Sequence, residues 1–103
     1  MQRTFKLTGK TQADGAQTID LTGYERAEVH QIQIDPSATP AAGTMDVSIR
    51  TPGGAGYTSL GSIDLVNGPL IVQYTGYADS MKLTPSLFDA AKTYNAFVFV
   101  LQV

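Results

Sequence analysis

Hydrophobic and polar residues alternate with a period of two along most of this chain. The run 44–51 shows the pattern most clearly, because Met45, Val47 and Ile49 share one face while the residues between them are polar. An amphipathic helix would instead repeat its apolar positions every three or four residues. The alternation therefore predicts β-strands with one buried side and one solvent-facing side, the arrangement typical of antiparallel sheets.

Segments rich in turn-forming residues separate these runs. Two prolines exclude residues 35–43 from the interior of a sheet, several glycines mark residues 51–56, and Asn67-Gly68 suits a tight hairpin. Only residues 84–92 could hold a helical turn, and that turn would be short. The chain is thus expected to contain eight strands, at residues 2–8, 16–21, 26–35, 44–51, 57–66, 69–75, 78–84 and 93–103.

The regular recurrence of short strands and turns predicts the fold class. Strands at this spacing are typical of an all-β sandwich or barrel, and eight of them with one long loop fit a jelly roll. A chain of 103 residues is the size of one domain. We therefore expect a single antiparallel Greek-key sandwich of jelly-roll type that spans residues 1–103.

Two of the expected strands change phase part-way along their length. In 26–35 the apolar positions switch faces near His30-Gln31, and in 57–66 they switch at Gly61. A β-bulge at each place would bring the apolar residues back to one face. Bulges also curve a sheet, and a small closed sandwich requires that curvature.

The last strand does not alternate, because both of its faces are apolar. Phe97 and Phe99 point one way, whereas Val98 and Val100 point the other, and residues 69–72 show the same pattern more briefly. A loop or the short helical segment of the same chain can cover the second face. Alternatively, a neighbouring subunit or partner covers it. The sequence leaves both explanations open.

A second copy of the chain is one way to cover that face. We expect a symmetric homo-oligomer formed through strands 69–75 and 93–103, with Ile71, Val98 and Val100 at the interface. Each fully buried aliphatic side chain contributes roughly 1.5–3 kcal/mol, so these residues, repeated by symmetry, would stabilise an assembly. On this interpretation, Val100→Lys would dissociate the oligomer and leave each subunit folded.

Composition narrows the functional classes. Charged residues make up 16% of the chain, the net charge is −2 and the pI is near 5.0, which argues against a general nucleic-acid binder held by phosphate contacts. The absence of cysteine excludes disulfides and thiolate metal sites. No apolar run is long enough to span a membrane, and the N-terminus lacks a signal-peptide pattern. We expect a protein made in the cytoplasm, with no membrane or nucleic-acid partner.

Residues that could carry out catalysis are scattered singly. The carboxylates show no paired spacing, the lone histidine, His30, is accompanied by no nucleophile elbow, and the glycines around Gly61 lack the lysine of a phosphate loop. A single histidine also excludes a multi-histidine metal site within one chain. We therefore expect no enzyme activity, no cofactor and no metal.

Tyrosines offer a different possibility. Tyr24, Tyr57 and Tyr77 stand at expected strand starts beside glycines. Exposed tyrosines at the edge of a sandwich can stack on sugars, so a carbohydrate-binding module is conceivable. Tyrosines at such positions more often close the ends of the core, and we favour closure here.

The chain lacks cysteine and tryptophan and is rich in Thr, Gly and Ala. Its stretch Gly76–Asp89 is followed by a long final strand. In these features it resembles the small jelly-roll capsid decoration, or cement, proteins of tailed bacteriophages. The resemblance implies a non-enzymatic virion protein, a dimer or trimer, that bridges and stabilises coat subunits on the outer capsid surface. Its partners would be further copies of itself and the major capsid protein or another virion protein.

A carbohydrate- or host-surface-binding module of a phage tail or fibre is the alternative. The two functions predict different surfaces. A cement protein should present flat apolar interfaces and form a symmetric oligomer. A binding module should instead present clustered exposed aromatic side chains beside a groove.

His30 is expected to be dispensable, because neither a second histidine nor a paired nucleophile accompanies it. The variant His30→Gln should retain the wild-type thermal midpoint and the wild-type affinity for a coat partner. Circular dichroism and a binding titration measure the two quantities. A large loss of binding with an intact fold would contradict the prediction.

Overall fold

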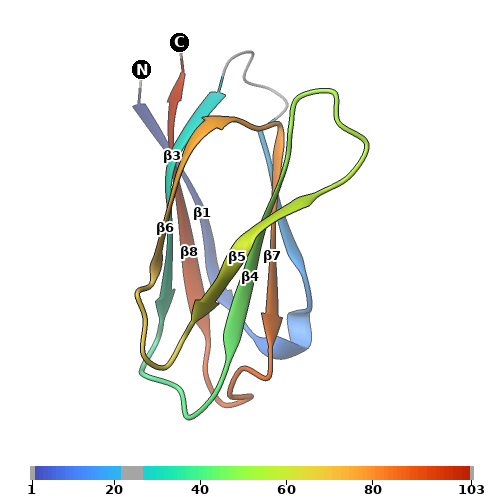
Figure 1. Cartoon of the computed structure of the whole chain (residues 1–103). Coiled ribbons are helices and arrows are strands. Elements are labelled where there is room, and N and C mark those ends of the chain that lie inside the picture. Colours follow the sequence, from blue (N-terminus) through green and yellow to red (C-terminus); the bar gives the residue numbers. More distant parts are fainter. Residues whose placement is uncertain (1, 22–26, 103) are drawn as a thin grey trace.

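Two antiparallel sheets packed face to face make up the molecule (Figure 1). The computed structural model describes residues 2–21 and 27–102. The strands in these residues are β1 (Gln2–Lys10), β2 (Gln17–Asp20), β3 (Ala27–Pro36), β4 (Thr44–Arg50), β5 (Thr58–Asp64), β6 (Ile71–Tyr77), β7 (Ser80–Ser86) and β8 (Tyr94–Gln102). A 3-10 helix, η1 (Gln12–Asp14), joins β1 to β2.

The strand order is that of an eight-stranded jelly roll. Sheet A has the order β1-β8-β3-β6 and sheet B the order β2-β7-β4-β5. Strands from opposite ends of the chain pair with one another: β1 with β8, β2 with β7, β3 with β6, and β4 with β5. Further pairing of β8 with β3 and of β7 with β4 completes each sheet. The predicted all-β Greek-key sandwich is confirmed.

The observed strands lie within two residues of the predicted bounds. The predicted helical turn in 84–92 is wrong, because β7 continues to Ser86 and a loop without a helix leads from there to β8. Pro85 is buried and pairs with Met45 of β4 as part of the extended strand β7. The short helix lies instead at η1, in a segment predicted to be a loop. Predicted strand positions 26 and 103 lie outside the described residues.

β-Bulges occur at both predicted places. The register of β3 with its two neighbours shifts between Val29 and Gln31, so His30 is the extra residue. The register of β5 with β4 shifts beside Gly61, which adopts a φ of 125°. The first bulge brings Ile32 to the same side of the sheet as Val29, and both are fully buried.

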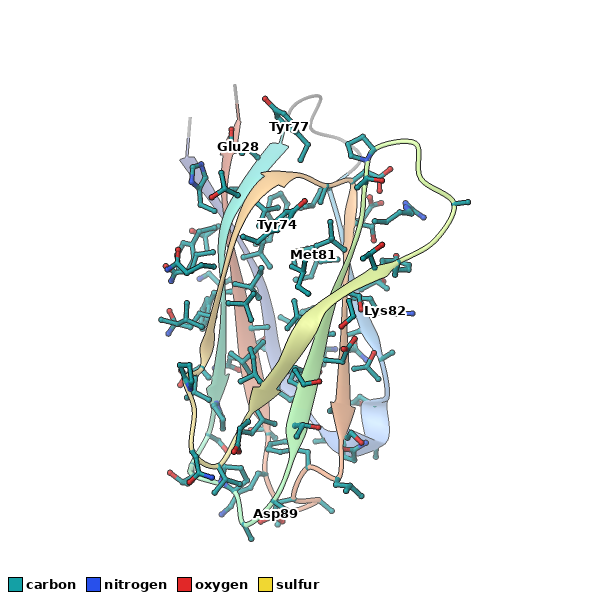
Figure 2. The ribbon with its side chains drawn as sticks, viewed as in Figure 1. Glu28, Tyr74, Tyr77, Met81, Lys82 and Asp89 are labelled. Atoms are coloured by element: carbon teal, nitrogen blue, oxygen red, sulfur yellow. The ribbon has the colours of Figure 1, made fainter. Side chains whose placement is uncertain are left out.

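The core lies between the two sheets and is filled by side chains from both. In Figure 2, Tyr74 of β6 and Met81 of β7 point into this space, whereas Lys82, the residue after Met81, points away from it. Phe5 and Leu7 of β1 pack against the same core from the edge of sheet A. The period of two along each strand thus separates buried from exposed side chains, as the sequence pattern predicts.

The predicted orientation of β8 is wrong. Val98 and Val100 are 0% and 1% exposed and face sheet B across the core. Phe97 and Phe99 lie on the other side of the strand and are only half-buried. The two valines are therefore covered by the chain's own second sheet and do not face a neighbouring copy.

The reversal has a simple steric cause. Stacked sheets lie about 10 Å apart, which leaves room for one layer of interdigitated side chains. Sheet B contributes large side chains to that layer, among them Met45, Met81 and Leu83, all fully buried. β8 runs through the middle of sheet A, and its inner side carries the small residues Ala96, Val98 and Val100 along most of its length, with the larger Tyr94 at its first position.

Val100→Lys is consequently expected to unfold the chain and not merely dissociate an oligomer. An unpaired ammonium in this core costs several kcal/mol, a large part of the stability of a small domain. Circular dichroism should show loss of the folded spectrum. Gln73→Lys, on the outer side of the same sheet, should remain folded and serves as the control. A folded Val100→Lys subunit would contradict the observed packing.

The hydroxyl of Tyr94 is buried without a hydrogen-bond partner among the described residues. Tyr94 begins β8, is fully buried, and meets the ring of Phe88 edge-on with the ring centres 5.9 Å apart. Burial, with a smaller contribution from the charge of Asp14, raises the pKa of Tyr94 to about 12. The ring therefore stabilises the core while its hydroxyl opposes folding.

Tyr94→Phe is expected to stabilise the protein by about 1 kcal/mol at neutral pH, because it removes a buried hydroxyl that has no partner. The gain should grow in alkali. The tyrosine pKa is about 12 in the folded chain and about 10 in the unfolded chain. The wild type therefore loses stability as the pH rises above about 10, by up to about 1.4 kcal/mol per pH unit.

Urea unfolding of the wild type and of Tyr94→Phe, at neutral pH and near pH 11, measures both effects. A variant that is less stable than the wild type at neutral pH would show that the hydroxyl has a favourable partner. Equal losses of stability in alkali would show that another group is responsible.

Candidate interaction surfaces

The outer side of sheet A carries apolar side chains in its middle. Directly paired residues of an antiparallel sheet project to the same side, so the register defines rows of neighbours. Two adjacent rows cross the sheet here, Lys6-Phe97-Gln33-Ile71 and Thr4-Phe99-Gln31-Gln73. We call these eight residues the phenylalanine face.

The phenylalanine face combines apolar surface with neutral amides. Phe97 and Phe99 are half-buried in the centre, and Ile71 on the edge strand β6 is 42% exposed. Within the two rows only Lys6 carries a charge. A partner can therefore cover this face with little desolvation of charged groups, which is the property of an interaction site.

The outer side of sheet B is polar by contrast. Asp46 in β4 accepts hydrogen bonds from Ser48 Oγ at 2.7 Å and from Ser59 Oγ at 2.6 Å. The Gly61 N–H donates to Ser59 Oγ at 3.1 Å. We call this surface the hydroxyl face, which also includes Ser62 and Thr84, both paired with Asp46. The outer side of sheet A thus exposes aromatic and aliphatic side chains among polar ones, whereas the hydroxyl face is polar.

A cluster of charged residues surrounds Tyr57 at the far end of the hydroxyl face. Arg50 Nε donates to Asp79 Oδ1 at 2.8 Å, and this hydrogen bond raises the pKa of Arg50. Arg50 Cζ lies 5.7 Å, and Lys82 Nζ 4.7 Å, from the centre of the Tyr57 ring. The Tyr57 hydroxyl and Ser80 Oγ are hydrogen-bonded at 2.7 Å. These cation–π and polar contacts attach the β4–β5 connection to the sheet.

The tyrosines in the described residues do not gather into a platform for sugar stacking. Tyr57 lies beneath two cations, and Tyr74 packs against the core. Tyr77, at the end of β6, is 47% exposed, whereas the other described tyrosines are half-buried or buried (Figure 2). Tyr24 lies outside the described residues. The expectation that Tyr57 and Tyr77 close the core is therefore wrong.

The residues considered for catalysis that lie in the described part of the chain form no metal-binding group. His30 is exposed at its bulge, with Nε2 3.9 Å from Glu28 Oε1. In residues 2–21 and 27–102, no group of three or more His, Asp or Glu side chains could hold a metal ion. No helix in the described part of the chain is long and apolar enough to cross a membrane.

The three residues predicted at an interface do not share one surface. Ile71 lies on the phenylalanine face, whereas Val98 and Val100 lie on the inner side of the same sheet. The exposed apolar residues of β8 are Phe97 and Phe99. The two-sided apolar pattern of this strand was a real signal of an exposed apolar face, but the pattern alone does not say which side faces the core.

An open hollow lies at the end of the sandwich where the β3–β4 and β5–β6 connections meet. Its volume is about 420 Å³. We call it the end hollow; its lining is mixed, with apolar groups from residues such as Pro36, Pro69 and Leu70 and polar groups from Asp35, Thr39 and Asn67. Leu87, in the β7–β8 connection at the same end, is 83% exposed. The sequence pattern did not indicate this exposure, because residues 84–92 were predicted only as a segment that could hold a short helical turn.

No protein-family model matches the sequence, and no curated protein matches it. Solved structures do share the fold. One is the Drosophila NLP core, described in connection with pentamer formation and histone binding. It aligns with a TM-score of 0.56 and 11% identity over 96% of this chain and 95% of that chain.

Phage-derived proteins also share the fold. A chain of the acidic stable capsid of Helicobacter pylori bacteriophage KHP30 aligns with a TM-score of 0.52 and 11% identity over 100% of this chain and 95% of that chain. The SPBc2 prophage-derived protein YomS aligns with a TM-score of 0.50 and 8% identity over 96% and 93% of the two chains. Identities this low establish a common fold alone.

Proposed function

We propose that this chain is a non-enzymatic structural protein of a bacteriophage particle, a capsid decoration (cement) protein that bridges and stabilises coat subunits. The observation that carries the proposal is the phenylalanine face. Half-buried Phe97 and Phe99 lie on the outer side of sheet A among side chains of which only Lys6 is charged within the two rows. That surface suits a broad, water-excluding contact with another protein better than it suits a small ligand.

The comparisons support a virion role. Solved structures of the same fold include a phage capsid chain and a prophage-derived protein. The fold also occurs outside phages, as in the Drosophila NLP core. The proposal therefore combines the resemblance in fold with the surface of this particular chain.

The two outer sides of the sandwich have different roles in this proposal. The phenylalanine face contacts the coat, and the hydroxyl face, where Asp46 is bonded to Ser48 and Ser59, points to solvent. Such a contact can be weak for one copy. Several copies joined in a homo-oligomer act at high effective concentration, so the assembly binds the coat lattice strongly.

Replacement of the two aromatic side chains tests the proposal. Phe97→Thr/Phe99→Thr removes the rings and keeps β-branched residues that favour strands. The probe is an empty shell assembled from the major capsid protein of the genome that encodes this chain. We expect the wild type to sediment with the shells and the double variant to bind at least about tenfold more weakly, a loss of about 1.4 kcal/mol.

Ser62→Ala, on the hydroxyl face, is the matched control and should bind like the wild type. Circular dichroism confirms that both variants are folded. Failure of the wild type to bind the shells would overturn the decoration role. If the double variant bound shells normally but lost self-association, the phenylalanine face would be a contact between copies, as the sequence predicted for Ile71.

A further inference from the structure

The pair Asn67-Gly68 lies in the connection between β5 and β6, which belong to different sheets, so the tight hairpin expected there is not formed. The pair is chemically reactive in its own right. The backbone nitrogen of Gly68 can close a succinimide ring on the side-chain amide carbon of Asn67, and glycine has no Cβ atom to hinder that nitrogen. Asparagine is also one of the thermolabile residues. The connection therefore contains a position at which the chain can modify itself.

In the folded chain, Asp64 binds both reactive groups of the pair. The Gly68 N–H donates to the Asp64 carbonyl at 2.8 Å, and the Asn67 side-chain amide donates to the Asp64 carboxylate at 3.1 Å. The backbone N–H of Asn67 donates to the other oxygen of the same carboxylate at 3.2 Å. The attacking nitrogen and the leaving amide are thus both held by one residue at the start of the turn.

Solvent has access to the pair. Asn67 is exposed and Gly68 is half-buried, and both line the end hollow, which is open. Water and hydroxide, the co-reactants of amide hydrolysis, can therefore reach the reacting atoms. Burial does not protect this asparagine, so its protection depends on the hydrogen bonds to Asp64.

We infer that Asn67 is a deamidation site that uses the Gly68 nitrogen as its nucleophile, and that Asp64 keeps the site closed while the turn is folded. Hydroxide removes the Gly68 amide proton, and the nitrogen then attacks Asn67 Cγ. The new N–Cγ bond closes a succinimide ring as the Cγ–Nδ2 bond breaks. The leaving group takes a proton from water, departs as ammonia and regenerates hydroxide.

A second water molecule completes the reaction. It adds to either carbonyl carbon of the succinimide, and the ring C–N bond at that carbon breaks. The products are an aspartate or an isoaspartate at position 67. No electrons are exchanged with another reagent, so the chain, hydroxide and water are sufficient.

The charge of Asp64 adds to the protection that its hydrogen bonds give. The bonds from Asn67 and Val66 lower the pKa of Asp64, so its carboxylate is ionised at the neutral and alkaline pH at which the reaction runs. A negative charge close to the Gly68 amide opposes removal of the amide proton, because a like charge disfavours the charged form. The turn must open before the nitrogen can attack.

Deamidation would change the turn permanently. It replaces the amide that donates to Asp64 by a second carboxylate, and like charges so close together repel. The lining of the end hollow contains one carboxylate, that of Asp35, and would gain another. Because the ammonia is lost, the modified chains accumulate with the time that the turn spends open.

Peptide mapping by mass spectrometry tests the inference on the purified full chain, with no coat partner. Samples are incubated at mildly alkaline pH, either folded or unfolded in guanidinium chloride. Asn67 should deamidate about tenfold or more faster in the unfolded chain, since the folded rate follows the population of the open turn. Asn95, the other asparagine of the chain, precedes Ala96 and is the internal control. It should react far more slowly than Asn67 in guanidinium.

Substitution of Asp64 tests its role. Asp64→Ala removes the side-chain bonds to Asn67 and should raise the deamidation rate of the folded chain about fivefold or more. Asp64→Ser keeps an acceptor for the backbone of the turn but does not hold the Asn67 amide, so it should react faster in the same way. In guanidinium both variants should react at the wild-type rate, because no turn is formed there.

Asp89→Ala is the matched control. The Asp89 carboxylate accepts the Ala91 N–H at 3.1 Å in the β7–β8 connection, so this variant also removes a carboxylate that bonds within a turn. It should deamidate at the wild-type rate when folded. Circular dichroism confirms that each variant is folded under the conditions of the incubation.

Asn67→Asp reproduces the aspartate product and tests its consequence. It should have a lower thermal midpoint than the neutral variant Asn67→Ser, and the difference should shrink in about 1 M salt, which screens the repulsion from Asp64. A midpoint equal to that of Asn67→Ser would overturn the predicted change of the turn.

The rates decide the inference itself. No deamidation of Asn67 in guanidinium would show that the pair is unreactive, and equal rates in the folded and unfolded wild type would show that the fold does not close the site. Wild-type rates in folded Asp64→Ala and Asp64→Ser would exclude the role of Asp64. None of these results depends on whether the chain binds a coat protein.

Discussion

β8 runs through the middle of sheet A, between β1 and β3, and its alternating side chains permit only two arrangements. Either the valines or the phenylalanines face the core, and a shift by one residue would exchange every position at once. Along the middle of the strand, opposite large residues such as Met45 and Met81 of sheet B, the interior holds Ala96, Val98 and Val100, and Tyr94 is buried on the same side at the start of the strand. Phe97 and Phe99 must then lie outside. The apolar outer side of the molecule is thus a direct consequence of how its core is filled.

At the end of the sandwich, the turn between β7 and β8 is determined by a side-chain contact and not by the packing of the core. There a single amide, that of Gln12, bonds to Pro85 and Phe88 and leaves Leu87 exposed at positive φ. A fold selected for stability alone would place glycine at this position.

The fold itself says little about function. Jelly rolls support many unrelated activities, and the structures that share this one include a phage capsid chain and a protein described with histone binding. What distinguishes this chain is the distribution of side chains over the common framework. One outer side exposes Phe97, Phe99 and Ile71 among polar side chains. The other carries serines bonded to Asp46, and the cations Arg50 and Lys82 lie against Tyr57.

The sequence by itself determined the strands, the bulges at His30 and Gly61, and the sandwich class, because alternation and turn residues are local signals that each strand carries alone. It also indicated that β8 has two apolar sides. Tertiary structure alone decided which side is buried, since that depends on the volume contributed by the opposite sheet. The tertiary structure also decided the contacts of Tyr57 and the exposure of Leu87. Their partners, Lys82 for Tyr57 and Gln12 for the Leu87 turn, are distant in sequence and meet only when the sheets are assembled.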